Sequence, residues 1–328
     1  MIETEVNSNS SNIFKPQVSF VLLSICTCKR PKMLENSLLS TNLLNLPNGI
    51  NVELLVVDND ADRSAKAIVD DVASKFHLKL HYEVEPQRGI SNARNKVLES
   101  AVNIGASHIL FFDDDELLTP DVLLEHIKLY QNTDNAYIVS GPTPNKFDNK
   151  YPSYIKKHMV FKQKTTKKTG LIRDNCAAGN VFFPVSVAKD FGLRFSSEYV
   201  FMGGEDGDFF SKASKLGFTI VWCNEAIIEE VVPQARTTIS YILKKCYYNG
   251  YAGAYAKFKS NKKCSKKIIY VLKTILVLFV NSLTLLPSLL LGLTGFFNTL
   301  GTMSRTFGKI CGAIKDEPYN FYEVIYGE

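Results

Sequence analysis

The first half of the chain alternates between strand-like blocks and segments in which apolar residues recur at helical spacing. The strand-like blocks fall at 18–25, 52–57, 78–83 and 108–112, and the first, second and fourth are almost continuously apolar. Apolar runs of this length are typical of strands buried on both faces of a sheet. The segments between and after them predict helices over 31–44, 65–75, 92–105 and 120–131. This βαβ alternation predicts an α/β fold in which a parallel sheet lies between helices.

The second half of the chain has a less regular pattern. Short strand-like runs occur at 137–141, 175–184 and 218–222, and helices are expected from Phe209 and over 237–255. A lysine-rich stretch at 146–168 is expected to be flexible or to face a substrate. Earlier in the chain, Ser91 is expected to cap the helix at 92–105, because a serine hydroxyl can accept a hydrogen bond from a first-turn amide. We divide the chain into a Ser/Asn-rich tail at 1–17, expected to be disordered, a globular domain at 18–236 and a C-terminal helical segment at 237–328.

The C-terminal segment is both basic and apolar. The chain has a net charge of +5, yet residues 231–315 contain no acidic residue, and most of their basic residues are lysines. Basic residues beside long apolar stretches predict contact with anionic lipid. Nucleic acid is not expected as a partner, because the basic run lacks arginines interleaved with aromatic residues.

Two apolar stretches follow this basic run. Residues 268–286 are long enough to cross a bilayer, whereas 287–300 are too short to do so comfortably. We favour a hairpin embedded in the membrane or lying at its interface. The lysines at the cytoplasmic lipid surface would then be Lys262, Lys263, Lys266 and Lys267. The alternative is a pair of buried helices packed on the globular domain or on a partner chain.

The cysteines and the N-terminal tail bear on the compartment. Seven cysteines occur without the spacing of a disulfide framework or of a zinc site. Unpaired thiols fit a reducing cytosol. The tail has neither the charged region nor the apolar core of a signal peptide. We therefore expect a cytoplasmic protein, associated with the inner face of the cell membrane through residues 237–328.

Polar clusters follow three of the predicted strands. They lie at 27–30, 58–60 and 113–116. Because ligands of parallel α/β sheets bind outside the carboxyl ends of the strands, these clusters are expected to meet at one site. Asp113, Asp114 and Asp115 repel one another unless a cation neutralises them, and their oxygen ligands suit Mg²⁺ or Mn²⁺. The alternative for these aspartates is a solvated acidic turn before the helix at Pro120.

Three further positions are candidates for the same site. Asp58 can accept a hydrogen bond from a base or ribose, although aspartate is also common in turns. Arg94 is unfavourable in the first turn of a helix unless it faces an anion, the alternative being an ordinary surface arginine. In the sequence 203–206, Gly-Gly-Glu-Asp, two flexible residues precede carboxylates that can deprotonate a hydroxyl. An acidic helix start would explain the same residues.

Five motifs in this order resemble family 2 glycosyltransferases with the GT-A fold. They are ICTCKRP at 25–31, LLVVDND at 54–60, RGISNARN at 88–95, FFDDDE at 111–116 and GGEDGDFF at 203–210. With VPQAR at 232–236, they are similar to the succinoglycan-assembly type of glucosyltransferase. The resemblance spans about 18–250. It implies transfer of a hexose, glucose in that type, from a UDP-sugar to a lipid-linked oligosaccharide or polysaccharide precursor in surface polysaccharide biosynthesis.

The resemblance also implies roles for individual residues. Asp206 would be the general base and Glu205 would position the acceptor. Thr27 and Asp58 would hold the uracil, Asp113 the ribose, and Asp115 the metal that grips the diphosphate. The residues expected to bind the donor are Thr27, Arg30, Asp58, Arg94, Asp113 and Asp114. The enzymes of this family that resemble the chain invert the anomeric centre, which implies a β-glycosidic product.

One departure from the family concerns the metal. Relatives often carry a histidine shortly after the last core strand, where this chain has Glu229. The expected ligands of Mn²⁺ or Mg²⁺ are Asp115, Asp113 and Glu229, the alternative being a site that relies on Asp115, the diphosphate and water. Two other functions are weighed against this one. A nucleotide-sugar-binding protein without turnover is disfavoured by the intact acidic residues. A metal-dependent nucleotidyltransferase is disfavoured because no Lys/Arg-rich glycine motif lies near the first strand.

Overall fold

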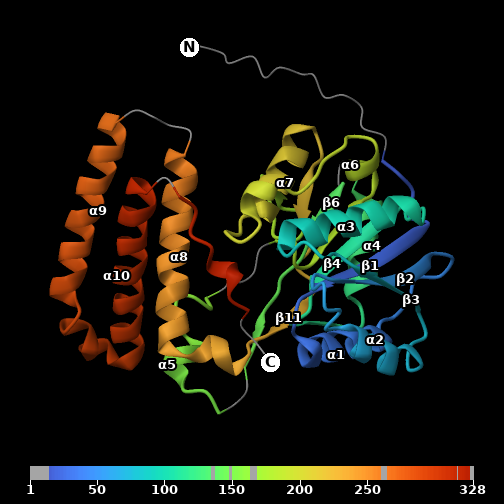
Figure 1. The fold of residues 1–328 in the computed structure, drawn as a ribbon, viewed down its shortest axis with the longest axis horizontal. Helices are drawn as coiled ribbons and strands as arrows, with labels where there is room; N and C mark the ends of the chain where they lie inside the picture. The colour runs from blue at the N-terminus through green and yellow to red at the C-terminus, as the bar shows by residue number, and fades with distance from the viewer. Residues whose placement is uncertain are drawn as a thin grey trace.

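A computed structural model describes residues 15–133, 137–147, 150–162, 168–259, 264–315 and 317–325. The expected disordered tail at 1–17 therefore lies almost wholly outside the described residues, as do Lys262, Lys263 and part of the lysine-rich stretch at 146–168. Figure 1 shows two parts, an α/β domain and a group of three long helices beside it.

The α/β domain is built on a mixed sheet. Its order is β3-β2-β1-β4-β9-β6-β10-β8 within the described residues. The strands are β1 (Phe20–Thr27), β2 (Asn51–Asp58), β3 (Lys79–Val84), β4 (His108–Asp113), β6 (Ile138–Ser140), β8 (Ile172–Arg173), β9 (Val181–Pro184) and β10 (Ile220–Trp222). β3, β2, β1 and β4 are mutually parallel, which confirms the prediction for the first half of the chain. β9 is antiparallel to both β4 and β6 and joins the two halves of the sheet.

Helices cover both faces of this sheet (Figure 1). One apolar cluster joins the sheet to α1 (Pro31–Ser40), α2 (Lys66–Ala73) and α4 (Val122–Asn132). The opposite cluster joins it to α3 (Ile90–Asn103), α6 (Ser186–Lys189) and α7 (Glu205–Lys215). Two predicted starts were wrong. α7 begins at Glu205 rather than Phe209, and α3 is capped by Gly89 at φ 137° rather than by Ser91, whose hydroxyl is buried one residue inside the helix.

A small second sheet lies at the carboxyl ends of the central strands. It consists of β5 (Glu116–Leu118), β11 (Ile228–Val231) and β7 (Asn145–Lys146), with β11 in the middle. The remaining short elements of the domain are η1 (Thr41–Leu43), α5 (Ser153–Lys156), η2 (Ser197–Tyr199) and η3 (Gln234–Thr237). Because β11 leads into η3, this sheet delivers the residues after Val231 to the same edge as the ends of β1 and β4.

The three long helices are α8 (Ile239–Phe258), α9 (Cys264–Thr284) and α10 (Gly292–Ile314), with η4 (Pro287–Leu291) between the last two. They lie side by side, with α9 farthest from the α/β domain (Figure 1). The helical character of 237–328 is therefore as predicted. The short apolar piece at 287–300 is not a separate helix, because it continues as α10 to Ile314 and packs along α8.

α9 differs from its two neighbours in exposure. Over Ser265–Thr284 it is long and apolar enough, by length and composition, to cross a membrane, and only 6% of this stretch is buried. Beyond α10 the chain turns back, and a short helix, η5 (Phe321–Glu323), places the C-terminal residues between the three helices and the α/β domain (Figure 1).

Candidate active site

The principal cavity has a volume of about 740 Å³ and opens at the carboxyl ends of β1 and β4. Its lining includes most of the predicted site residues, which are Thr27, Arg30, Arg94, Asp113, Asp114, Asp115, Glu205 and Asp206. These residues come from β1 and the residue before α1, from α3 and α7, and from the end of β4 with the turn after it, so the fold unites motifs that lie far apart in the sequence. The polar clusters after the predicted strands therefore meet at one cavity, as expected.

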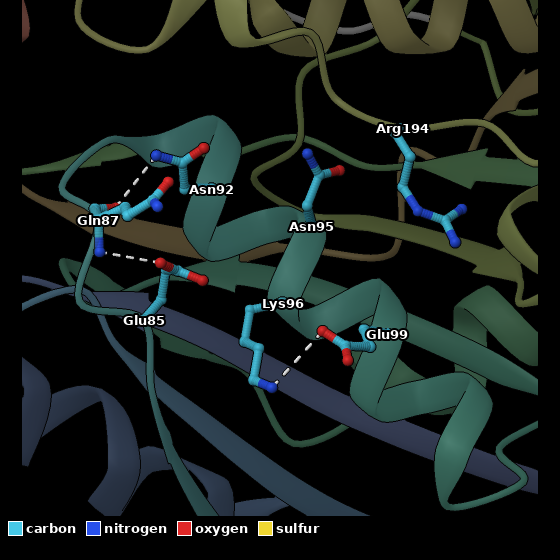
Figure 2. A pocket seen from close by; sticks show the side chains of 7 residues that line it. All are labelled: Glu85, Gln87, Asn92, Asn95, Lys96, Glu99 and Arg194. Atoms are coloured by element: carbon cyan, nitrogen blue, oxygen red, sulfur yellow. Dashed lines mark hydrogen bonds and ion pairs between the residues drawn. The ribbon is translucent and has the colours of Figure 1, made fainter.

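A second hollow, of about 270 Å³, lies beside α3 (Figure 2). Its side chains are polar and largely bonded within the protein. Lys96 Nζ lies 3.2 Å from Glu83 and 3.5 Å from Glu99, and the Asn92 amide donates to the Gln87 carbonyl. None of the predicted catalytic residues lines this hollow. The first cavity is therefore the candidate site.

Three arginines neutralise the aspartates after β4. Arg30 reaches Asp114 at 2.9 Å and Asp115 at 2.7 Å, and Arg236 reaches Asp115 at 2.7 Å. Arg94 reaches Asp113 at 3.3 Å. Because each added cation relieves the repulsion among adjacent carboxylates, the cluster is stable here as a buried charge network.

The carboxyl groups of Asp114 and Asp115 differ in pKa. Burial raises the pKa of Asp114 to about 7, although Arg30 and the Thr27 hydroxyl, 2.8 Å away, oppose the rise. Burial would also raise the pKa of Asp115, but Arg236 and Arg30 outweigh it and hold the pKa below its usual value. Asp115 is therefore the member of the cluster held most firmly in the charged form.

The second acidic cluster begins α7. Gly203 and Gly204 have φ of 74° and 98°, a left-handed backbone that favours glycine, and they turn the chain so that Glu205 and Asp206 line the cavity. Glu205 is buried and pairs with Arg94. Its other oxygen, Oε2, is buried without a hydrogen-bond partner among the described residues. A buried acceptor without a donor is costly in a folded protein, which makes this oxygen a candidate for substrate contact.

Arg94 connects the two acidic clusters. It is 6% exposed, and its guanidinium contacts Glu205 on one side and Asp113 on the other. Nearby carboxylates raise its pKa despite burial, so it is permanently charged. The sequence predicted that Arg94, at the start of α3, faces an anion. In the structure that anion is supplied by the protein itself, through the carboxylates of Glu205 and Asp113.

Two predicted residues lie outside the lining of the cavity. Asp58 is fully buried below it and accepts hydrogen bonds from the Ala65 amide and the Tyr82 hydroxyl, both at 2.8 Å. Its Oδ1 has no partner in the part of the chain that the structure describes. The neighbouring Asn59 lines the cavity instead. The role of Asp58 in holding a base stays a prediction.

The expected third metal ligand, Glu229, lies outside the cavity. On β11 its side chain pairs with Lys146 at 2.7 Å and does not line the cavity. The next residue, Glu230, points to the other face, lines the cavity and lies 3.3 Å from Arg236. Because side chains of a strand alternate between faces, an error of one position moves the carboxylate out of the site.

Several residues that line the cavity were not predicted from the sequence. They are Arg236 on η3, Tyr241, Lys245 and Tyr248 on α8, and Phe321 and Tyr322 on η5. The α8 residues recur at the spacing of one helix face, a signal that could have marked them. The η5 residues carry no local signal, because only the return of the chain after α10 brings them to the site.

The carboxylates that line the cavity supply part of the ligands that a divalent cation needs. No cluster of three or more His, Cys, Asp or Glu side chains that could hold a metal occurs among the described residues. The Asp113 side chain is 41% exposed and faces the cavity together with Asp115 and Glu230. Carboxylate oxygens of this kind, completed by phosphate oxygens and water, are the usual ligands of Mg²⁺ and Mn²⁺. The residues therefore fit a cation that enters with a phosphate-bearing ligand.

The arrangement combines two chemical capabilities. Arg30 and Arg236 place positive charge near the floor of the cavity, where a diphosphate can be held. Asp206, at the start of α7, offers a carboxylate from the other wall, where it can accept a proton. An anion-binding side facing a basic group is the layout that group transfer from a diphosphate needs.

Two glycosyl transferase family models and a curated relative match this chain. The family model described as glycosyl transferase family 2 matches residues 23–192, and that of glycosyl transferase family group 2 matches residues 108–307. The succinoglycan biosynthesis protein ExoM of Rhizobium meliloti (strain 1021) is 28% identical over 228 residues, which cover 70% of this chain and 72% of that protein.

Two solved structures share the fold. The mannosyltransferase PcManGT from Pyrobaculum calidifontis, in complex with GDP-Man and Mn²⁺, has a TM-score of 0.60 at 16% identity, covering 90% of this chain and 88% of that one. Residues 1–349 of TarS from S. aureus, in complex with UDP-GlcNAc, have a TM-score of 0.52 at 15% identity, covering 88% and 91%. The mixed sheet described above is thus of the GT-A type.

Proposed function

Because this chain belongs to glycosyl transferase family 2 and is a glycosyltransferase, we propose that it moves a hexose from a UDP-sugar to a hydroxyl of a glycan acceptor with inversion. The observation that carries the proposal is the single cavity that unites the aspartates of β4 with Glu205-Asp206 of α7 through Arg94. Family membership also disfavours the two alternatives, a binding protein without turnover and a nucleotidyltransferase.

The donor is held by the floor of the cavity. Thr27 and Asp113 are the proposed contacts of the uridine, and Arg30 and Arg236 those of the diphosphate. Asp58, which the resemblance also assigns to the uracil, lies outside the lining of the cavity. A divalent cation held by Asp113 and Asp115, with Glu230 in place of Glu229, would neutralise charge on the diphosphate. Both arginines already bond to Asp115, so a diphosphate would share them with that carboxylate.

The acceptor reacts at the other wall. Asp206 takes the proton from the acceptor hydroxyl, and the oxygen attacks the anomeric carbon on the face opposite the leaving UDP. Attack from that face inverts the centre, so an α-linked donor gives a β-glycosidic bond. Glu205, fixed by Arg94, presents its unpartnered Oε2 to a second hydroxyl of the acceptor. Glucose as the donor sugar is proposed from the likeness to the succinoglycan biosynthesis protein.

A lipid-linked acceptor would be met at the inner face of the cytoplasmic membrane. Side chains of α9 such as Leu272, Leu276 and Val280 are at least half exposed, and Lys266 and Lys267 stand at its start. An exposed apolar helix with lysines at its start fits adsorption to anionic lipid. The L276E/V280E variant should lose binding to phosphatidylglycerol vesicles in flotation, and unchanged binding would contradict this role of α9. Both side chains are exposed, so the fold should tolerate the change.

Binding of the donor tests the proposed function. Calorimetry with UDP, UDP-glucose, UDP-galactose, UDP-GlcNAc and GDP-mannose, each with Mn²⁺ or Mg²⁺, should show binding of UDP and at least one UDP-sugar. The R236Q variant should weaken the binding, because one charge for the diphosphate is removed. If no nucleotide or nucleotide sugar binds with metal present, the proposal fails.

A further inference from the structure

The C-terminal segment 317–325 forms part of the wall of the active-site cavity. After α10 the chain returns, and Phe321, Tyr322, Val324 and Ile325 line the cavity. Backbone contacts hold it there. The Tyr322 amide donates to the Phe201 carbonyl at 3.0 Å, and Arg88 donates to the Glu323 carbonyl at 3.1 Å. The segment is therefore tied both to the loop before α7 and to the loop before α3.

Three aromatic rings from this segment and α8 form what we call the aromatic wall, consisting of Tyr248, Phe321 and Tyr322. The Tyr248 and Phe321 rings stack at 4.8 Å, and Tyr322 meets them edge-on at 5.5 and 5.2 Å. Lys245 Nζ lies 4.7 to 4.9 Å from all three ring centres and donates to the Tyr322 hydroxyl at 2.6 Å. The wall is thus a packed unit with one charged group fixed against it.

The aromatic wall lies directly against the turn that presents Glu205 and Asp206. A Cβ atom on Gly203 would come within 2.4 Å of the Tyr322 ring and 2.5 Å of the Tyr248 hydroxyl. Glycine at 203 is therefore required by the wall as well as by its positive φ. The proposed base and the unpartnered Glu205 oxygen consequently lie next to an aromatic surface.

The side chains around Tyr322, Glu205 and Asp206 favour one class of acceptor. Tyr322 is 44% exposed although its neighbours Tyr248 and Phe321 are buried, so its ring is the part of the wall that a ligand can reach. A sugar ring has an apolar C–H face that can lie on an aromatic ring and a rim of hydroxyls that can bond to carboxylates. A simple alkyl alcohol would leave Glu205 Oε2 without a second hydroxyl.

We propose that Tyr322 is the platform for the reacting sugar ring of the acceptor, so the C-terminal segment determines which acceptor is used. This assignment rests on the proposed function, because it takes Asp206 as the group beside which the acceptor hydroxyl lies. Tyr322 contacts the acceptor sugar and leaves the donor to the residues of β1, β4 and η3.

The test compares Y322A and Y322F with Y319A as the matched control. Tyr319 lies in the same segment but packs on Tyr247 and Tyr251, at 5.3 and 5.6 Å, and does not line the cavity. The probes are octyl β-glucoside, octyl β-galactoside and octyl β-mannoside, with 1-octanol as the acceptor that lacks a sugar. UDP release is measured with and without each probe, at saturating donor, and UDP affinity is measured separately.

In the wild type, at least one glycoside should raise UDP release above the rate without acceptor, and 1-octanol should not. Y322A should raise the apparent KM for that glycoside more than tenfold and leave UDP affinity and the acceptor-free rate within about twofold. Y322F and Y319A should keep a KM close to that of the wild type. The proposal is overturned if Y322A leaves the KM unchanged, if it abolishes UDP binding, or if no glycoside stimulates the wild type. Absence of UDP binding by the wild type would instead refute the proposed function.

Discussion

The contact between α8 and α10 gives a stability prediction that tests how the C-terminal helices are assembled. Gly250 of α8 lies against the backbone of α10. A Cβ atom at this position would come within 1.9 Å of the Arg305 carbonyl oxygen and 2.8 Å of its carbonyl carbon. Gly253, in the same helix, has no neighbour within 4 Å of the same atom. The G250A and G253A variants therefore make the same chemical change in two different surroundings.

The expected magnitudes follow from two opposing effects. Alanine is favoured over glycine in a helix interior by about 0.5–1 kcal/mol, and G253A should gain this amount. In G250A the clashing atoms are backbone, so no side-chain rotation relieves them and α10 must move away. Overpacking of this kind costs about 1–3 kcal/mol, and the severity of the clash places G250A near the upper end. G250A should therefore be less stable than G253A by about 2–3 kcal/mol.

The assay is thermal unfolding of the full chain, followed by circular dichroism, with amide hydrogen exchange to locate the loss. With an entropy of unfolding of about 2.1 cal/mol/K per residue, a difference of about 2–3 kcal/mol corresponds to a gap in Tm of about 3–4 °C in a protein of this size. In G250A, exchange should rise in α8 and α10 and stay unchanged in β1. Equal Tm values for the two variants would refute the close packing of α10 on α8.

Three further outcomes are expected. R94M should leave Glu205 as a buried, unpaired carboxylate and lower the free energy of unfolding by about 3–5 kcal/mol in a urea titration. R236Q, which removes one of the two cations on Asp115, should weaken UDP binding at least tenfold in calorimetry while R173Q, outside the cavity, leaves it unchanged. Burial raises the pKa of Glu53, but hydrogen bonds from neighbouring side chains outweigh it and lower the pKa below 4.5. Because the charged form is favoured in the folded state, E53Q should be less stable than the wild type at pH 7 by about 0.5–1 kcal/mol. This difference should vanish as the pH falls through the folded pKa, and a difference that grows with acid would contradict the sign.

The sequence was informative wherever local pattern decides structure. The strands β1, β2 and β4 are buried apolar runs, and the acids after β4 lie at the carboxyl edge of the sheet, as parallel topology requires. The start of α3 was misplaced because Gly89, with its positive φ, takes the capping position that the side chain of Ser91 was expected to fill. Such boundaries depend on backbone conformation more than on the hydrogen-bonding potential of a side chain.

The parts that could not be predicted depend on long-range packing. β9 lies between β4 and β6 although 67 residues separate Val181 from Asp113, the last residue of β4. The pairing of Arg236 with Asp115 follows from β11 entering the small sheet, and the choice between Glu229 and Glu230 follows from its register. Tyr322 reaches the site only because α10 returns the chain along α8. A pattern in a local window carries no information on these arrangements.

The central claim, that the carboxylate of Asp206 deprotonates the acceptor in a cavity shared with the donor, is tested most directly by comparing D206N with D208N. Asp208 lies two residues on in the same helix, pairs with Lys212 at 2.6 Å and does not line the cavity. The measurement is UDP release from the active UDP-sugar in the presence of metal and a membrane lipid extract, with UDP affinity determined in parallel. D206N should lower kcat by at least about 100-fold with UDP affinity unchanged, and D208N should retain the wild-type kcat. Turnover by D206N at the wild-type rate would contradict the account.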